Sequence, residues 1–143
     1  MSLILYIYKY VDGESAVFSL VSVVRRLHEQ ILIKDNSKLI GESADISLES
    51  IISRAFAHRY YGNSLKSHLE FSCYLVEAII VGHPFLDGNK RTALALLRIL
   101  EPEFAVFDLL CHDNELEKII VLIAAKQATH KNLLEYYKLM KKT

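Results

Sequence analysis

The stretch HPFLDGNKR, which runs from His83 to Arg91, brings together residue types that can handle a nucleotide phosphate. The imidazole of His83 can accept a proton from an attacking hydroxyl near neutral pH. Asp87 offers hard carboxylate oxygens of the kind that bind Mg²⁺. Lys90 and Arg91 add positive charge beside a Gly-Asn turn. We therefore expect chemistry on a nucleotide phosphate, with Mg²⁺ held by the carboxylate.

The surrounding sequence predicts that this stretch joins two helices. An apolar run ends near Gly82, and a run rich in alanine and leucine extends from Thr92 to Leu100. Gly88 and Asn89 then lie where the second helix begins, and free N–H groups at a helix N-terminus bind anions. Lys90 and Arg91 oppose the helix dipole in this first turn, which favours a bound anion as compensation.

HPFLDGNKR resembles the signature HxFx(D/E)GNxR of the Fic/Doc family, which fixes six of nine positions. The resemblance implies that His83 is the general base and that Asp87 holds Mg²⁺. It also implies that Gly88, Asn89 and Arg91 bind the phosphates. We add Lys90 to this set because its positive charge lies in the same turn. Phe85 is expected to anchor the loop to the core.

Two features place the chain between the branches of this family. The NKRTAL ending of the motif is similar to that of death-on-curing toxins, which phosphorylate a target protein. Lys90 and Leu94 stand where the Fic branch usually has a glycine and an arginine. Gly88, in contrast, resembles the Fic branch. We expect phosphate transfer from ATP to a protein hydroxyl, as in the toxin of a toxin-antitoxin pair. AMP transfer is the alternative, and a non-catalytic nucleotide-binding regulatory module is a second one.

The resemblance also implies partners. The target protein, for which family members suggest a translation factor, would be aligned by a flap that precedes the central helix. That flap would comprise Tyr60, Tyr61, Gly62, Asn63, Ser64, Leu65 and Lys66. No Ser or Thr is followed four residues later by Glu, and Leu94 replaces the arginine that such a glutamate would meet. Inhibition is therefore expected from an antitoxin-like protein in trans, and the sequence leaves a homo-oligomer open.

Composition sets further limits. The 143 residues are enough for one Fic/Doc-like domain, with its core at about 15–140. Seventeen basic and seventeen acidic residues leave no net charge, which argues against nucleic acid or an anionic membrane as partner. The N-terminus lacks a basic leader and a cleavage site, so a cytoplasmic location is expected.

The predicted fold class is all-α: a Fic/Doc-like helical bundle with the motif loop between two central helices, plus a short N-terminal strand or small hairpin. Residues 3–10 are the candidate strand, and Phe104 to Phe107 are expected to pair with it. Asn114 and Glu117 are read as a capping pair for a helix that ends at Gln127. The helices are expected at 15–33, 46–58, 65–82, 92–100, 114–127 and 129–140. Histidines outside the motif are expected to be structural: His28, His58, His68, His112 and His130.

Overall fold

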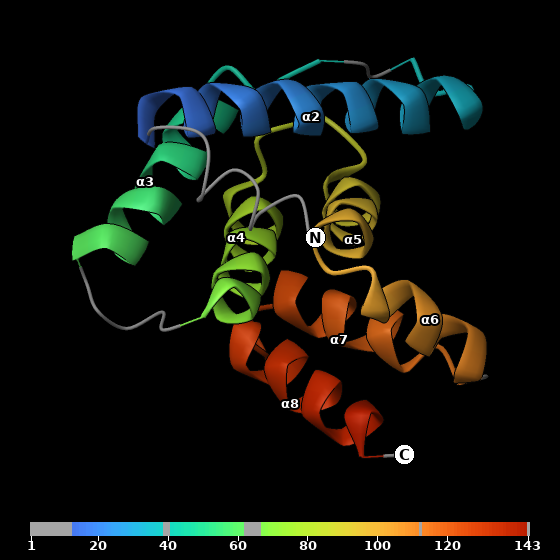
Figure 1. The fold of residues 1–143 in the computed structure, drawn as a ribbon. Helices are drawn as coiled ribbons and strands as arrows, with labels where there is room; N and C mark the ends of the chain where they lie inside the picture. Colours follow the sequence, from blue (N-terminus) through green and yellow to red (C-terminus); the bar gives the residue numbers. More distant parts are fainter. Residues whose placement is uncertain (1–12, 39–40, 62–66, 112, 143) are drawn as a thin grey trace.

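The computed structural model describes residues 13–38, 41–61, 67–111 and 113–142. Within these ranges the chain forms seven helices (Figure 1). They are α2 (Gly13–Lys34), α3 (Leu48–Tyr61), α4 (His68–Gly82), α5 (Asn89–Leu100), α6 (Glu103–Leu110), α7 (Glu115–Ala124) and α8 (His130–Lys141). The predicted all-α bundle is thus confirmed. The candidate N-terminal strand lies outside the described residues.

Helix α4 is the centre of the bundle. It contacts α3 and α5 on its sides and α7 and α8 toward its N-terminal end. Helix α2 lies across the top of this arrangement, above the loop that joins α4 to α5 (Figure 1). Helix α4 is buried on most sides, since Phe71, Leu75 and Ile79 are fully covered. The motif loop is therefore enclosed between the α4–α5 pair and α2.

Local sequence explains where α3 and α4 begin. The Ser47 hydroxyl accepts a hydrogen bond from the backbone N–H of Ser50 (3.0 Å), so Ser47 caps α3. Ser67 caps α4 in the same way through Glu70 (3.1 Å). The two helices then converge at Gly82, where an added Cβ would lie 2.6 Å from Cδ1 of Ile51. A glycine is needed here for close packing of α3 on the end of α4.

The extended segment predicted at Phe104–Phe107 is wrong, because these residues belong to helix α6. Proline is well tolerated at the start of a helix, and Pro102 occupies the position just before α6. Phe104 and Phe107 are three residues apart, so helical geometry places both on the buried side. Their spacing was compatible with a helix, and the short apolar run concealed this periodicity.

The boundaries of α7 also differ from the prediction. Asn114 precedes the helix, but it has a left-handed backbone (φ 54°) and its side chain makes no capping hydrogen bond. The helix ends at Ala124, because Lys126 adopts φ 60° and the N–H of Gln127 bonds back to the carbonyl of Leu122 (2.9 Å). The predicted capping pair and the end at Gln127 are therefore wrong.

The buried side chains form a hydrophobic cluster with members from all seven described helices. Cys73 is part of this cluster, whereas Cys111 is partly exposed. Within the described residues, we find no helix whose length and apolar character would let it cross a membrane.

Candidate active site

The motif forms the loop between α4 and α5, as the sequence predicted. His83 caps α4 with a left-handed backbone (φ 49°), and its N–H bonds to the carbonyl of Ile79 (3.2 Å). Gly88 is the last residue before α5 and is also left-handed (φ 78°). The first helical hydrogen bond of α5 joins Thr92 to Gly88 (2.9 Å), so the N–H groups ahead of Thr92 form the open end of the helix. His83 thus stands beside a helix N-terminus.

Gly88 cannot be replaced without strain. Its positive φ disfavours any side chain, and a Cβ would lie 2.8 Å from Cδ2 of Leu32 on α2. The same Cβ would meet the side chains of His28 and Arg91 at 3.6 Å. The glycine of the motif therefore allows α2 to approach the start of α5 closely.

The Asn89 side chain links the start of α5 to the backbone of the motif loop. Its Oδ1 accepts a hydrogen bond from the N–H of Phe85 and its Nδ2 donates to the carbonyl of Phe85, both at 3.0 Å. These contacts fix which end of the amide is nitrogen, and Nδ2 lies 3.2 Å from Nδ1 of His83. Nδ1 therefore accepts a hydrogen bond, and a neutral His83 carries its proton on Nε2. The Asn89 side chain, expected at the phosphates, positions the loop and His83 in this structure.

Asp87 and Arg91 meet on the outer side of the turn. Asp87 accepts hydrogen bonds from the N–H of Gly88 (2.8 Å), the hydroxyl of Ser37 (3.3 Å) and the guanidinium of Arg91 (3.3 Å). The pKa of Asp87 lies below its usual value, chiefly because of the Gly88 N–H; desolvation, the next largest effect, opposes this shift, and hydrogen bonds and charge from Ser37 and Arg91 add to it. Asp87 is therefore a stable anion that can receive a cation.

Arg91 has a second acidic partner that was not predicted. Its other terminal nitrogen pairs with the carboxylate of Asp35, in the turn that follows α2. The guanidinium is therefore held between two carboxylates, Asp35 and Asp87. The side chains of Asp35 and Arg91 are 41% and 45% exposed, so an incoming anion can reach this ion pair and replace it. Nothing in the polar segment that follows α2 marked Asp35 from the sequence.

His28 is a second residue of the site that was not predicted. It is buried in α2, and its Nε2 donates to the carbonyl of Asp87 (2.7 Å). Its ring stacks on Phe85 with centroids 3.6 Å apart and an angle of 7° between the planes. Phe85 itself is buried, in agreement with its expected role as an anchor. His28 continues the buried positions Val21 and Val24 on α2, and that spacing was a signal in the sequence.

A short extended segment borders the loop on its other side. Glu42 forms an antiparallel bridge with Phe85, in which Ser43 donates to Pro84 (2.7 Å) and Leu86 donates to Gly41 (3.1 Å). No strand or helix was predicted for this segment. Segment 41–43 therefore brings main-chain groups to the edge of the motif.

Two predicted groups remain apart from these contacts. Lys90 is exposed, and none of the described residues pairs with its ammonium group. Of the predicted flap, Tyr60 and Tyr61 belong to the last turn of α3, which runs past the expected end at His58. The other five flap residues, 62–66, lie outside the described residues. The structure thus gathers His83, Asp87, Gly88, Asn89 and Arg91 in one loop and leaves Lys90 available to a ligand.

Comparison with known proteins agrees with this geometry. The family model for the Fic/DOC family matches residues 18–100, which is more than half of the chain and spans α2 to α5. No curated protein and no solved structure matches the chain. The matched region includes the motif loop and the two unpredicted contacts, His28 and Asp35. The chain belongs to the Fic/DOC family.

Proposed function

We propose that this protein transfers a phosphate from ATP to a hydroxyl group of a target protein. Membership of the Fic/DOC family suggests a protein-modifying transferase in general. The observation that carries the proposal is the α4–α5 loop, which places His83, Asp87 and Arg91 around the start of one helix. A base, a metal-binding carboxylate and phosphate-binding groups are the elements that phosphoryl transfer needs.

The nucleotide would bind with its phosphates at the start of α5. The helix N-terminus attracts anions, and Lys90 and Arg91 supply full charges beside it. Arg91 would exchange the carboxylate of Asp35 for a phosphate oxygen. This exchange costs little free energy, because one exposed ion pair is replaced by another. Lys90 needs no such exchange, because no described residue holds its ammonium group. Both cations would then offset the charge that develops on the transferred phosphate.

Asp87 is the residue that would hold Mg²⁺. Its carboxylate is anionic, and its contacts with Ser37 and Arg91 are long, at 3.3 Å, and partly exposed. These contacts can be exchanged for a hydrated ion without unfolding the loop, so the residues present fit the metal. Bound there, Mg²⁺ would neutralise phosphate charge and orient the leaving group.

His83 would take the proton of the target hydroxyl. The hydroxyl oxygen attacks the γ-phosphorus, the proton passes to the imidazole, and the bond from the γ-phosphorus to the bridging oxygen breaks to release ADP. In this structure neutral His83 carries its proton on Nε2 and receives a hydrogen bond from Asn89 at Nδ1. For Nε2 to act as the base, this 3.2 Å contact must be given up when substrates bind.

AMP transfer is the second candidate, and Gly88 favours it. A glycine at this position resembles the Fic branch, which transfers AMP, although in this structure the glycine makes room for Leu32 of α2. Lys90 favours phosphate transfer, because its side chain takes the place of a glycine in that branch. The two reactions differ in which phosphorus atom is attacked.

Labelled ATP distinguishes these candidates. The purified protein would be incubated with a cytosolic extract and ATP labelled at the α or the γ position, with His83→Ala as control. Label transferred only from the γ position supports the proposed kinase. Label from the α position establishes AMP transfer. ATP binding without labelled product would leave the regulatory module as the function.

We further propose that an antitoxin-like protein inhibits the enzyme in trans. Absence of the Ser/Thr-to-Glu spacing and the presence of Leu94 support this, and so do exposed apolar side chains on α6 and α7, such as Leu109 at 79%. The reaction needs ATP, so we expect it in the cytoplasm, and a homo-oligomer is compatible with the same apolar surface. If the purified chain proves fully inhibited on its own, the proposal of an inhibitor in trans is wrong.

A further inference from the structure

A groove between α3 and α4 leads to the motif loop. It has a volume of about 450 Å³ and ends at Gly82, the residue before His83. Ile46, Arg54, Tyr74 and Val81 are among its lining residues. We name it the α3–α4 groove.

We propose that the α3–α4 groove binds an extended segment of the target protein, with an aliphatic side chain next to the acceptor residue and an acidic side chain about two residues away. This inference rests on the transferase activity proposed above and names the class of its protein substrate. It does not depend on the predicted flap at residues 60–66.

The position of the groove favours the target over the nucleotide. The phosphate-binding groups lie at the start of α5, and Asp87 and Arg91 face the end of α2. The groove lies on the other side of α4, where α3 packs. His83 caps the end of α4, and α3 and α5 lie on different sides of α4 (Figure 1). The two substrates would thus reach His83 from opposite sides.

The near end of the groove is apolar. Val81 and Ile46 are 41% and 38% exposed, although aliphatic side chains gain stability when they are covered. Val81 precedes Gly82 in α4. Ile46 lies in the segment before α3 and lines the same groove. An aliphatic side chain next to the acceptor would cover them.

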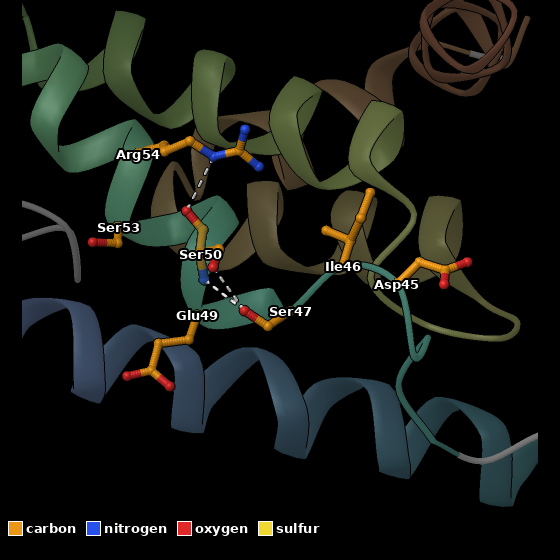
Figure 2. A pocket seen from close by; sticks show the side chains of 7 residues that line it. All are labelled: Asp45, Ile46, Ser47, Glu49, Ser50, Ser53 and Arg54. Atoms are coloured by element: carbon orange, nitrogen blue, oxygen red, sulfur yellow. Dashed lines mark hydrogen bonds between the residues drawn. The ribbon is translucent and has the colours of Figure 1, made fainter.

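The middle of the groove offers a positive charge, that of Arg54. Arg54 donates through Nε to the carbonyl of Ser50 (3.4 Å), and no described carboxylate pairs with its terminal nitrogens. Figure 2 shows Arg54 reaching from α3 toward α4, whereas Glu49 points toward α2. The carboxylate of Glu77, also in the groove, is engaged by the backbone N–H of His130 (3.0 Å). Arg54 is therefore the charge available to a ligand here.

The position of Arg54 sets the spacing of the two preferences. On α3, Arg54 lies between Ile51, which packs against Gly82, and His58, which stacks on Tyr74, so it is about level with Ala78 of α4. Ala78 and Gly82 are four residues apart, which corresponds to about 6 Å of helix. An extended chain advances about 3.3 Å per residue, so the acidic side chain is expected about two positions from the acceptor.

A second hollow continues from the groove along α3. It shares Ile46 and Arg54 with the groove and is lined by the hydroxyls of Ser47, Ser50 and Ser53 (Figure 2). Ser47 and Ser50 bond to each other (2.9 Å), and Ser53 is exposed. This polar side suits the main chain of a peptide that lies against the apolar wall.

The test uses peptides with a central Ser, Thr or Tyr and four randomised positions on each side. They are captured on the immobilised full chain and, in parallel, labelled with ATP. The wild type should enrich Asp or Glu about two positions from the acceptor by about two- to fivefold, as expected for an exposed ion pair. It should also enrich Leu, Ile or Val next to the acceptor. Arg54→Glu should reverse the charge preference, and Val81→Asp should remove the aliphatic one.

Arg26→Glu is the matched control, because Arg26 is an exposed arginine of α2 that does not line the groove. It should keep the wild-type preferences. The same preferences in Arg54→Glu as in the wild type, or no preference in the wild type, would overturn the groove proposal. Capture with the expected preferences but without label would refute the transferase and keep the groove. Label transfer without these preferences would support the transferase and refute the groove.

Discussion

The α4–α5 pair carries a histidine and a carboxylate at both of its ends, but the carboxylate is buried at one end and partly exposed at the other. At the far end, where α4 begins and α5 has ended, Glu101 is buried with its side chain 8% exposed. It accepts hydrogen bonds from Nδ1 of His68 (2.8 Å) and the hydroxyl of Ser72 (3.0 Å). All three residues belong to the helix pair itself or its last cap, so this cluster ties α4 to α5.

At the motif end, the partners come from elsewhere. Asp87 and Arg91 meet Ser37 and Asp35, which follow α2, and their side chains are 40–45% exposed. The two contacts of Asp87 with Ser37 and Arg91 are long, at 3.3 Å. Ligands compete easily with exposed ion pairs, because such pairs contribute little to stability. Similar residue types thus serve packing at one end and are available for binding at the other.

The strongest test of this contrast is His83→Ala. Loss of a general base lowers a transfer rate by about 10²- to 10⁴-fold. The free energy of unfolding should change by less than about 0.5 kcal/mol, because His83 is exposed and its side chain makes one weak contact. Label transfer and chemical denaturation measure the two quantities. Equal activity in variant and wild type would remove His83 from the mechanism.

Glu101→Ala should have the opposite profile. Its removal takes the acceptor from Nδ1 of the half-exposed His68, whereas the Ser72 hydroxyl can still donate to the carbonyl of His68 (2.9 Å). The free energy of unfolding should therefore fall by about 1 kcal/mol, as for the loss of one hydrogen bond. Glu101→Gln keeps an acceptor oxygen and should lose less. The exposed Glu117→Ala is the control, expected within about 0.5 kcal/mol of the wild type. A stability of Glu101→Ala equal to that of Glu117→Ala would show that the far cluster does not hold the helices together.

Asp35→Asn probes the availability of the motif end. It removes a carboxylate that competes with phosphate for Arg91, so ATP with Mg²⁺ should bind about two- to fivefold more tightly, by the usual strength of an exposed ion pair. Asp45→Asn removes the same charge from the same connecting segment without touching Arg91 and should not change affinity. Titration calorimetry on both variants decides the point. Weaker binding by Asp35→Asn would mean that Asp35 positions Arg91 for the nucleotide.

The sequence predicted what local patterns determine. Apolar periodicity located α2 to α5, and the spacing of the motif placed His83, Asp87 and Arg91 in one loop. The contacts that α2 makes with this loop could not be predicted, because His28 and Asp35 are more than fifty residues from their partners. Such contacts depend on how α2 crosses the helix pair, which no local pattern records.

Errors in the prediction have the same origin. Phe104 and Phe107 were assigned to a strand because a run of four residues does not distinguish a period of two from one of 3.6. Asn114 was assigned a cap by residue type, but the backbone turned left-handed and directed its side chain elsewhere. Residue types alone also did not separate His28, which touches the motif, from His68, which does not. Tertiary packing made these distinctions.

The smallest expected effect concerns the pH dependence of Asp87. Its pKa in the folded protein is lowered, chiefly by the N–H of Gly88, relative to an ordinary aspartate. A lowered pKa stabilises the fold above the unfolded pKa of about 3.9, and this contribution disappears as the pH falls through the folded value. Asp87→Asn should therefore be slightly less stable than the wild type near pH 7, and the difference should vanish in acid. Denaturation at several pH values measures it, and the exposure of Asp87 keeps it small. A difference that persists below the folded pKa would show that Asp87 supports the loop by packing as well as by charge, which would weaken the contrast with Glu101.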